Sequence, residues 1–244
     1  MAGLDMNLEG KTALVTGASR GLGRAIALGL HSVGAHVIAA ARPSDDLSSL
    51  ASELGARGTI WPCDATGDEI LAHIQAMPRL DILINNAGTN TPQPFVEVDD
   101  SVLDRMLDLN IRSAFRISRE CVRKMSAGSV IIHMSSQMGH VGSPRRTVYC
   151  MTKHAIEGLT KAMAVELAPQ GIRVNAIAPT FIETPMTRPM LADPGFMAFV
   201  KQMIPMGKVG QPSHVASAAV YLCSPGAGMI TGHSLLVDGG WTAQ

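Results

Sequence analysis

The chain has 244 residues, and its 20 Lys and Arg balance its 20 Asp and Glu, so the formal net charge is zero. This balance argues against a nucleic-acid or acidic-membrane partner recognised by net charge, and no apolar run reaches the roughly 18 residues that span a bilayer. The length suits a single α/β domain, 1–244, that buries about 70% of its unfolded surface.

The four cysteines lie far apart in the sequence, at Cys63, Cys121, Cys150 and Cys223. They form no CxxC or His-paired pattern, so we expect no metal site. The start of the chain lacks the basic, apolar and small-residue pattern of a secretory signal. These features predict a reducing, cytoplasmic location.

The first predicted element is a strand over residues 11–16, followed by a glycine turn and a helical pattern over 24–33. Gly17, Gly21 and Gly23 give the turn the spacing G-x-x-x-G-x-G. Glycines let the backbone bend tightly and approach a pyrophosphate, which the free amides and dipole of a helix start stabilise. Taken alone, such a turn is equally compatible with a simple bend.

The second predicted strand, over 35–41, ends at Arg42 and not at an acid. NAD sites usually place an acid about 20 residues beyond the glycine turn to hold the ribose 2′-hydroxyl. Arg42 and Arg20 are instead suited to pair with a 2′-phosphate, which favours NADP(H). Asp45 and Asp46 keep NAD(H) as the alternative cofactor, and a solvated strand-end cation is the other interpretation of Arg42.

Strands predicted over 57–62 and 80–84 are followed by Asp64 and by the sequence NNAG, which ends at Gly88. Asp64 is a candidate cofactor ligand or a cap for the next helix, a role that Asp fills readily. Asn110 lies in the helical run DLNIRSAF, where an asparagine can also bond locally to the backbone.

A strand predicted over 129–135 is followed by Ser136, and then by Tyr149 and Lys153 in YCMTK. A phenol with a pKa of about 10 is a poor acid or base at neutral pH. An ammonium one helical turn away favours the phenolate and is expected to lower the phenol's pKa. The three residues predict a device that moves a proton onto or off a carbonyl oxygen, although Y-x-x-x-K also occurs by chance on amphipathic helices.

The last predicted strands cover 172–177 and 233–237, with helical patterns between most strands. This alternation predicts an α/β fold, a single doubly wound parallel sheet with helices on both faces. Ligands bind such sheets beyond the carboxyl ends of strands, where the strand order switches. The candidates that follow strands are Gly17, Arg42, Asp64, Asn86, Ser136 and Pro179.

Residues 185–211 carry many Met, Leu and Phe side chains, interrupted by Pro and Gly. Such flexible apolar surface suits a lid over a modest apolar substrate, and a core or subunit contact is an equally good interpretation. Arg145 and Arg146, shortly before Tyr149, could anchor a carboxylate or phosphate of the substrate, although loop arginines are more often solvated.

The ordered set of TGASRGLG, CDAT, NNAG, Asn110, Ser136, Tyr149 with Lys153, APTFIET and VDGG resembles the short-chain dehydrogenase/reductase family over about residues 8–240. The resemblance implies a Rossmann-type fold. It also implies an NAD(P)-dependent oxidoreductase that passes hydride to a ketone or aldehyde, or takes it from the alcohol.

The resemblance assigns catalysis to Asn110, Ser136, Tyr149 and Lys153. Tyr149 would be the general acid/base, and Asn110 would hold a water linking Lys153 to solvent; the family spacing selects Ser136 over Ser135. The implied cofactor contacts are Gly17, Ser19, Arg20, Gly21, Leu22, Gly23, Arg42, Asp64, Asn86, Ala87, Gly88, Tyr149, Lys153, Pro179, Ile182 and Thr184. Thr180 departs from the family, which commonly has Gly there, close to the nicotinamide.

The resemblance also implies a homotetramer and a small carbonyl or alcohol substrate. Family members that serve acyl carrier protein have arginines near Ala127 and Gln170, and their absence argues modestly against that substrate. Two alternatives remain at this stage: an NAD-dependent sugar or polyol dehydrogenase, and a nucleotide-sensing binding protein without turnover.

Overall fold

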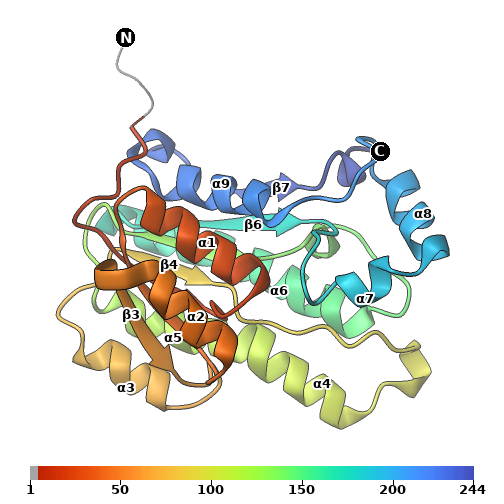
Figure 1. The fold of residues 1–244 in the computed structure, drawn as a ribbon, viewed down its shortest axis with the longest axis horizontal. Helices are drawn as coiled ribbons and strands as arrows, with labels where there is room; N and C mark the ends of the chain where they lie inside the picture. Colours follow the sequence, from red (N-terminus) through yellow and green to blue (C-terminus); the bar gives the residue numbers. More distant parts are fainter. Residues whose placement is uncertain (1–4) are drawn as a thin grey trace.

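The computed structural model describes residues 5–244; residues 1–4 of the predicted domain lie outside this range. Within it, seven parallel strands form one sheet in the order β3-β2-β1-β4-β5-β6-β7 (Figure 1). The strands are β1 (Thr12–Thr16), β2 (His36–Ala41), β3 (Gly58–Pro62), β4 (Ile82–Asn85), β5 (Val130–Met134), β6 (Arg173–Pro179) and β7 (Ser234–Val237). The predicted doubly wound, Rossmann-type fold is confirmed.

Helices connect the strands and cover both faces of the sheet (Figure 1). They are α1 (Gly21–Ser32), α2 (Asp45–Leu54), α3 (Glu69–Ala76), α4 (Asp100–Leu107), α5 (Ser113–Val122), α6 (Thr147–Leu167), α7 (Arg188–Leu191), α8 (Pro194–Met203) and α9 (Pro212–Cys223). Helices α1 and α9 pack against each other in front of the sheet in Figure 1. The other face is covered by α3, α5 and α6, whose apolar side chains share a core cluster there.

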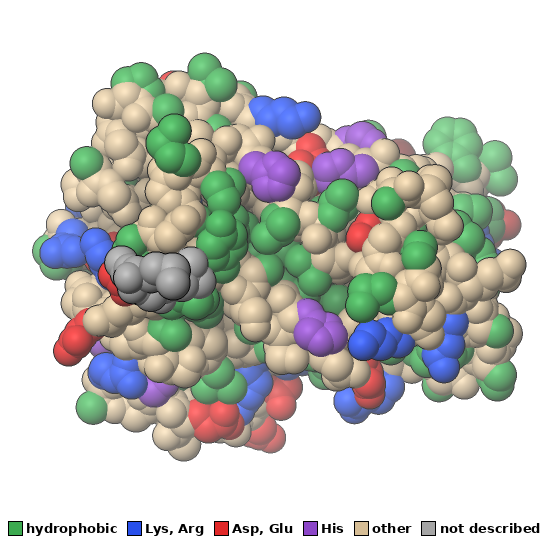
Figure 2. All heavy atoms as spheres, turned by 90° about the horizontal axis from the view of Figure 1, so that it is seen from above, with side chains coloured by type: hydrophobic (Ala, Val, Ile, Leu, Met, Phe, Trp, Pro, Cys, Tyr) green, Lys and Arg blue, Asp and Glu red, His purple; other side chains and the backbone are tan. Residues whose placement is uncertain are grey.

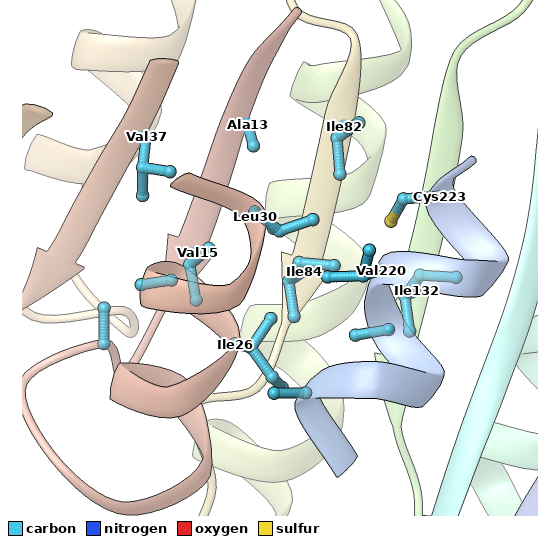
Figure 3. Packing of buried hydrophobic residues seen from close by; sticks show 14 of the residues in the cluster. Ala13, Val15, Ile26, Leu30, Val37, Ile82, Ile84, Ile132, Val220 and Cys223 are labelled. Carbon is cyan, nitrogen blue, oxygen red and sulfur yellow. The ribbon is translucent and has the colours of Figure 1, made fainter. Parts of the chain in front are cut away.

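The strands read as continuous apolar runs because both faces of the sheet are buried. Successive side chains alternate between the faces, so Ala13 and Val15 join one core cluster while Leu14 joins the other. Figure 3 shows the first cluster, where Ile26 of α1 and Val220 of α9 meet side chains of the central strands. The two clusters together fix the sheet between its helical layers.

The strand order reverses at β1, which lies between β2 and β4. The chain builds β2 and β3 to one side of β1 and then returns to place β4 on the other. Connections leave β1 and β4 in opposite directions at this point, which opens a crevice for ligands in sheets of this kind. Gly17 follows β1 and Asn86 follows β4, so both candidates lie at the switch point.

The helical run that contains Asn110 is not a regular α-helix. A π-helical turn, Asp108–Arg112, joins α4 to α5 and holds Asn110, which is 3% exposed. Such turns are rare in proteins, and those that occur often lie at functional sites. The sequence pattern predicted a helix here, and it gave no signal for the extra residue in this turn.

Two negative findings concern residues 5–244. No helix in that range combines the length and hydropathy required to span a bilayer. No group of three or more His, Cys, Asp or Glu side chains converges there in an arrangement able to hold a metal ion.

Candidate active site

The glycine turn after β1 has a backbone that other residues would not tolerate. Gly17 and Gly21 have φ of +63° and +59°, in the left-handed region that side chains disfavour. A Cβ on Gly23 would lie 2.2 Å from the Gly17 carbonyl oxygen. Helix α1 begins at Gly21, and its N-cap residue, Arg20, makes no side-chain cap. The first-turn amides are therefore available to an anion.

Asn86 ties this turn to the end of β4. Its Nδ2 donates to the carbonyl oxygens of Thr16, at 2.9 Å, and Gly17, at 3.2 Å. The amides of Asn86 and Ala87 both donate to the Thr16 hydroxyl at 3.0 Å. Asn86 thus shapes the turn as well as lining it. Sequence reasoning did not assign Thr16 this role, although it is the threonine that opens TGASRGLG.

The segment after β6 lies against the glycine turn. A Cβ built on Gly21 would be 3.6 Å from the Thr184 Cβ. The Thr184 amide donates to the Thr187 hydroxyl at 3.0 Å, and the Thr187 amide donates back to the Thr184 hydroxyl at 3.3 Å. Ile182 is anchored by a backbone bridge to Gly210. Two segments far apart in the sequence therefore meet where a dinucleotide would lie, and Thr187 is a positioning residue that sequence reasoning missed.

Two arginines near this turn are exposed and unpaired. Arg20 and Arg42 form no ion pair with any of residues 5–244. Arg24, by contrast, donates to the Asp46 carbonyl oxygen at 2.7 Å and pairs with Glu53. Arg20 and Arg42 thus keep their donors available for a phosphate.

Asp64 is placed at the end of β3 by a local turn. Its Oδ1 accepts from the Thr66 amide at 2.9 Å and from the Thr66 hydroxyl at 2.8 Å. The next helix begins at Glu69 and has Asp68 as its N-cap residue. The alternative interpretation of Asp64 as the cap of that helix is therefore wrong.

The two serines at the end of β5 face different surroundings. The Ser136 hydroxyl donates to the Pro179 carbonyl oxygen at 3.4 Å and accepts from the Met138 amide at 3.1 Å. The Ser135 hydroxyl lies 2.8 Å from where a Cβ on Gly139 would sit, under the loop to α6. Ser136 is therefore the serine directed toward the segment that carries Ile182 and Thr184.

Tyr149 and Lys153 lie one turn apart on α6, and both are directed at the ends of the central strands. The Lys153 ammonium is 5.4 Å from the centre of the Tyr149 ring. It donates to the Met134 carbonyl oxygen, the last of β5, at 2.7 Å. Lys153 is only 6% exposed, whereas Tyr149 is half-buried. The pair is thus held beside Ser136.

Burial controls the protonation of this pair. It raises the pKa of Tyr149 to about 12, although the Ser136 hydroxyl and the Arg146 charge each lower it. Burial also lowers the pKa of Lys153 to about 8, against the carboxylate of Glu157, which raises it. The expectation that Lys153 brings the pKa of Tyr149 below its ordinary value is therefore wrong for this structure, because desolvation of the phenolate outweighs the neighbouring charges.

Asn110 joins the loop after β4 to helix α6. Its Oδ1 accepts from the Thr89 amide at 2.8 Å, and its Nδ2 donates to the Thr89 carbonyl oxygen at 2.9 Å and to the Thr152 hydroxyl at 3.1 Å. A Cβ on Gly88 would lie 3.3 Å from the same Oδ1. These bonds are long-range, so the local bonding considered from the sequence is not what the structure has.

The segment 185–211 folds over this region as α7 and α8. Its buried residues Leu191, Val200 and Ile204 form a third apolar cluster with Met138 and Phe181. Tyr149 and Cys150 pack against the edge of this cluster. The segment therefore has a core of its own that contacts the candidate proton donor.

Thr180 lies between Pro179 and Phe181 at the end of β6. Its amide donates to the Val237 carbonyl oxygen at 3.3 Å. Its hydroxyl oxygen is buried and has no hydrogen-bond partner among residues 5–244. The side chain that replaces the expected glycine thus presents an unsatisfied polar atom next to the Ser136 acceptor, Pro179.

Two surface hollows of about 560 and 550 Å³ lie away from all these residues. The second lies at the amino ends of the strands, where its lining includes Lys11 before β1 and the first residues of β4 and β6, Ile82 and Arg173. Parallel sheets bind ligands at the opposite, carboxyl edge. We therefore assign no role in the candidate site to either hollow.

Comparison with known proteins identifies a family whose members match nearly the whole chain. A family model described as enoyl-(acyl carrier protein) reductase matches residues 17–242. L-xylulose reductase of Mesocricetus auratus is 38% identical over 241 residues, 98% of this chain and 99% of that protein. The 3-oxoacyl-(acyl-carrier-protein) reductase of Rickettsia felis is 39% identical over 238 residues, 96% of this chain and 98% of that protein.

Solved structures also match this chain over nearly its full length. A short-chain type dehydrogenase/reductase from Mycobacterium marinum superposes with a TM-score of 0.92 at 34% identity, covering 98% of each chain. A gluconate 5-dehydrogenase from Burkholderia cenocepacia, in complex with NADP, superposes with a TM-score of 0.92 at 28% identity and also covers 98% of each chain. The match in both cases extends over the whole sheet and its helices.

Proposed function

This chain belongs to the short-chain dehydrogenase/reductase family, and from that premise we propose that it reduces a ketone or aldehyde with NADPH, or oxidises the alcohol in reverse. It is an oxidoreductase, as its named relatives are. The observation that carries the proposal is the gathering of Ser136, Tyr149 and Lys153 beside the glycine turn and the Thr184 segment.

Each of the three residues has a distinct task. A bound NADPH would supply hydride to the carbonyl carbon, and negative charge would then grow on the carbonyl oxygen. The Ser136 and Tyr149 hydroxyls donate to that oxygen, and donors already in place lower the barrier because they need not reorganise. With a pKa of about 12, Tyr149 remains protonated at neutral pH and can give its proton to the product alkoxide. Lys153 stabilises the phenolate that remains.

The turn fits a dinucleotide phosphate, and the two exposed arginines fit NADP(H). A side chain at Gly23 would clash with the Gly17 carbonyl oxygen and force the turn open. Glycine at this position therefore keeps the turn tight enough for its backbone to approach a pyrophosphate. Arg20 and Arg42 would pair with the 2′-phosphate. Contacts from Ser19, Leu22, Asp64, Ala87, Gly88, Pro179 and Ile182 complete the proposed cofactor site.

Replacing Arg42 with Ala tests the cofactor assignment. We expect a KM for NADPH about tenfold or more higher and a KM for NADH that changes less than twofold, because only the former carries the phosphate. Arg105→Ala, at an exposed arginine of α4, is the matched control. Equal changes for the two cofactors in Arg42→Ala would exclude Arg42 from phosphate recognition.

Turnover itself tests the enzyme assignment against a nucleotide-binding protein without catalysis. NADPH absorbance is followed across a panel of ketones, oxo acids, oxo esters, sugars and quinones. We expect consumption of NADPH with at least one class and formation of the matching alcohol. Tight NADPH binding without consumption in any class would contradict the proposal.

A small carbonyl compound is the substrate that we favour. The relatives include L-xylulose reductase and a 3-oxoacyl-(acyl-carrier-protein) reductase. Ala127 and Gln170 stand where arginines would serve the carrier protein, so we assign this chain to the small-molecule group. Residues 185–211 would close over the substrate, since their apolar cluster reaches Tyr149.

We further propose a homotetramer of single-domain subunits. Three large apolar side chains on α5 and α6 are exposed: Phe115 at 50%, Met151 at 47% and Val165 at 79%. Figure 2, looking down on the top of Figure 1, shows hydrophobic and His side chains with few Lys or Arg in the middle of another face. Light scattering should give a molar mass four times that of one chain for the wild type and a lower molar mass for Val165→Asp. The mass of a single chain for both proteins would refute the tetramer.

A cytoplasmic location completes the proposal. All four cysteines are free, and Cys63, Cys121 and Cys223 are buried. Burial raises the pKa of the Cys63 thiol to about 11 and that of Cys223 to about 12, which disfavours the reactive thiolate. Unpaired thiols of this kind suit a reducing compartment. Localisation of a tagged full-length chain by microscopy in its host, with fractionation as a check, tests this point.

A further inference from the structure

Arg146 is a buried cation without an adequate partner. It immediately precedes α6, and its side chain is only 7% exposed. Its Nη1 is buried with no hydrogen-bond acceptor among residues 5–244, and its Nη2 donates to the Met190 sulfur at 3.2 Å. No carboxylate in the described range forms an ion pair with it.

The guanidinium lies between three parts of the proposed site. Arg146 is the N-cap residue of α6, and its carbonyl oxygen accepts from the amide of Cys150, the residue after Tyr149, at 2.8 Å. Its charge lowers the pKa of Tyr149. Its carbon is 5.9 Å from the centre of the Phe181 ring, in the segment that leads to Ile182. Met190 belongs to α7, in the proposed lid. The proton donor, the nicotinamide segment and the lid therefore converge on one cation.

These neighbours do not satisfy a guanidinium. A thioether is a weak acceptor and an aromatic face offers no lone pair, whereas a buried charge requires an opposite charge with hydrogen bonds. Arginine cannot shed its proton to avoid the cost. Met138 and Phe181 make the surroundings apolar, which strengthens any ion pair formed there.

The loop before Arg146 is held in a strained form. Arg145 has φ of 61°, the only residue other than glycine in the described range with a positive φ. Its carbonyl oxygen accepts from the Gln93 amide at 2.9 Å, which ties it to the loop after β4. Strain of this kind persists only where the surrounding structure enforces it, and it is common at ligand sites.

We propose that Arg146 binds a carboxylate of the substrate, so that the enzyme acts on short oxo acids and the corresponding hydroxy acids. The carboxylate pairs with the guanidinium, displacing the Met190 sulfur, while the carbonyl oxygen accepts from Tyr149 and Ser136. The carboxylate is unchanged in the reaction; hydride and proton go to the carbonyl as above. This inference rests on the proposed oxidoreductase function.

A carboxylate fits better than a phosphate. Arg146 supplies one charge in an apolar setting, and the side chain of its neighbour Arg145 is exposed. A phosphate dianion would leave a negative charge without a buried partner, whereas a carboxylate matches one guanidinium in forked geometry.

The test compares acids with their neutral esters. Reduction by NADPH is measured for acetoacetate and for levulinate against the methyl ester of each, with dihydroxyacetone phosphate as a third arm. We expect wild-type kcat/KM to be at least about tenfold higher for one of the acids than for its ester. Arg146→Gln should lower kcat/KM for that acid about 100-fold, mainly through KM, and change the ester less than about threefold.

Arg145→Gln is the matched control, because it removes the same charge from the preceding residue, whose side chain is exposed. It should change either substrate less than about threefold. Arg146→Met keeps the apolar packing without the charge, so it replaces Arg146→Gln if the glutamine variant is unstable. The same changes in kcat/KM for acid and ester are expected of it. The wild-type comparison of acid and ester needs no variant at all.

Three results would overturn the inference: no preference for either acid, equal losses for acid and ester in Arg146→Gln, or a preference for the phosphate. In all three, reduction of esters or other neutral carbonyls would leave the proposed function intact. Failure to consume NADPH with any carbonyl, charged or neutral, would instead remove the proposed function.

Discussion

At the residue scale, the site combines a phenol that is hard to ionise with an ammonium that is easy to neutralise. Burial drives both pKa values, to about 12 for Tyr149 and about 8 for Lys153. The arrangement suits reduction at neutral pH, where the phenol must start protonated and the ammonium must be charged when the phenolate forms. A buried ammonium is unfavourable for stability, and the fold retains it where catalysis requires a cation.

The rate of carbonyl reduction should therefore depend on the protonation of Lys153. We expect kcat/KM to be constant from pH 6 to about 8 and to fall above that, as the ammonium loses its proton and no longer stabilises the Tyr149 phenolate. Lys153→Arg should be slower but show no fall near pH 8, because a guanidinium stays charged. The same fall in Lys153→Arg would mean that another group titrates.

How far the sequence predicts a residue's role depends on how local the cause is. Ser136, Tyr149 and Lys153 were predictable because a strand end and one helical turn bring them together. The pKa of Tyr149 was not, since it depends on burial by tertiary packing beside the cluster of Phe181 and Leu191. Thr16 was missed for a similar reason, since its bonds reach across the sheet to Asn86 and Ala87.

At the element scale, the turn between β1 and α1 is defined by steric exclusion. Its backbone approaches itself so closely at Gly23 that only a hydrogen fits. Asn86 then fixes the turn by bonding two of its carbonyl oxygens. The site is thus built on a strand–turn–helix unit whose shape is determined by contacts within the chain.

Gly23→Ala should disrupt this unit. The added Cβ would lie 2.2 Å from the Gly17 oxygen, so the turn must open. We expect NADPH affinity to fall about 100-fold, with a lower thermal midpoint, measured by fluorescence titration and calorimetry. At Gly142 an added Cβ meets nothing within 4 Å, and Gly142→Ala should change affinity less than about twofold. Similar losses in both variants would contradict the steric account.

Strand β5 carries a second buried group that responds to pH. His133 is fully buried, with Nδ1 3.2 Å from the Asn85 Nδ2 and no partner in the described range for Nε2. Burial, aided by the Lys153 charge, lowers its pKa to about 4. An unfolded histidine titrates near pH 6.5. Between these values the unfolded state binds more protons, so stability falls as the pH is lowered.

We expect the free energy of unfolding to drop between pH 7 and pH 5 by about 2 kcal/mol more in wild type than in His133→Gln. Urea unfolding of both proteins at the two pH values measures this difference. Other titrating groups cancel in the comparison, since they are present in both chains. An equal drop would show that His133 is not the group responsible.

At the scale of the whole molecule, the strands of the one sheet are parallel, so their carboxyl ends lie at a single edge (Figure 1). The candidates that directly follow strands, such as Gly17, Asn86 and Ser136, therefore lie at that edge. The fold class, a doubly wound parallel sheet, was predictable because apolar runs alternating with helical patterns require a sheet covered on both faces. The π-helical turn at Asn110 was not predictable from local sequence, and the Asn110 side chain bonds to Thr89 and Thr152, which are distant in the sequence. The packing of 185–211 also depends on long-range contacts, here with Met138 and Phe181.

The most direct test of the account is Tyr149→Phe, which removes the proposed proton donor and leaves the ring in place. The Kd for NADPH and the rate of reduction of the best substrate are measured on the same preparation, with circular dichroism as the check on folding. The account predicts a Kd within about threefold of wild type and a kcat lower by about 10³ or more. A variant that keeps a tenth or more of the wild-type kcat would contradict it.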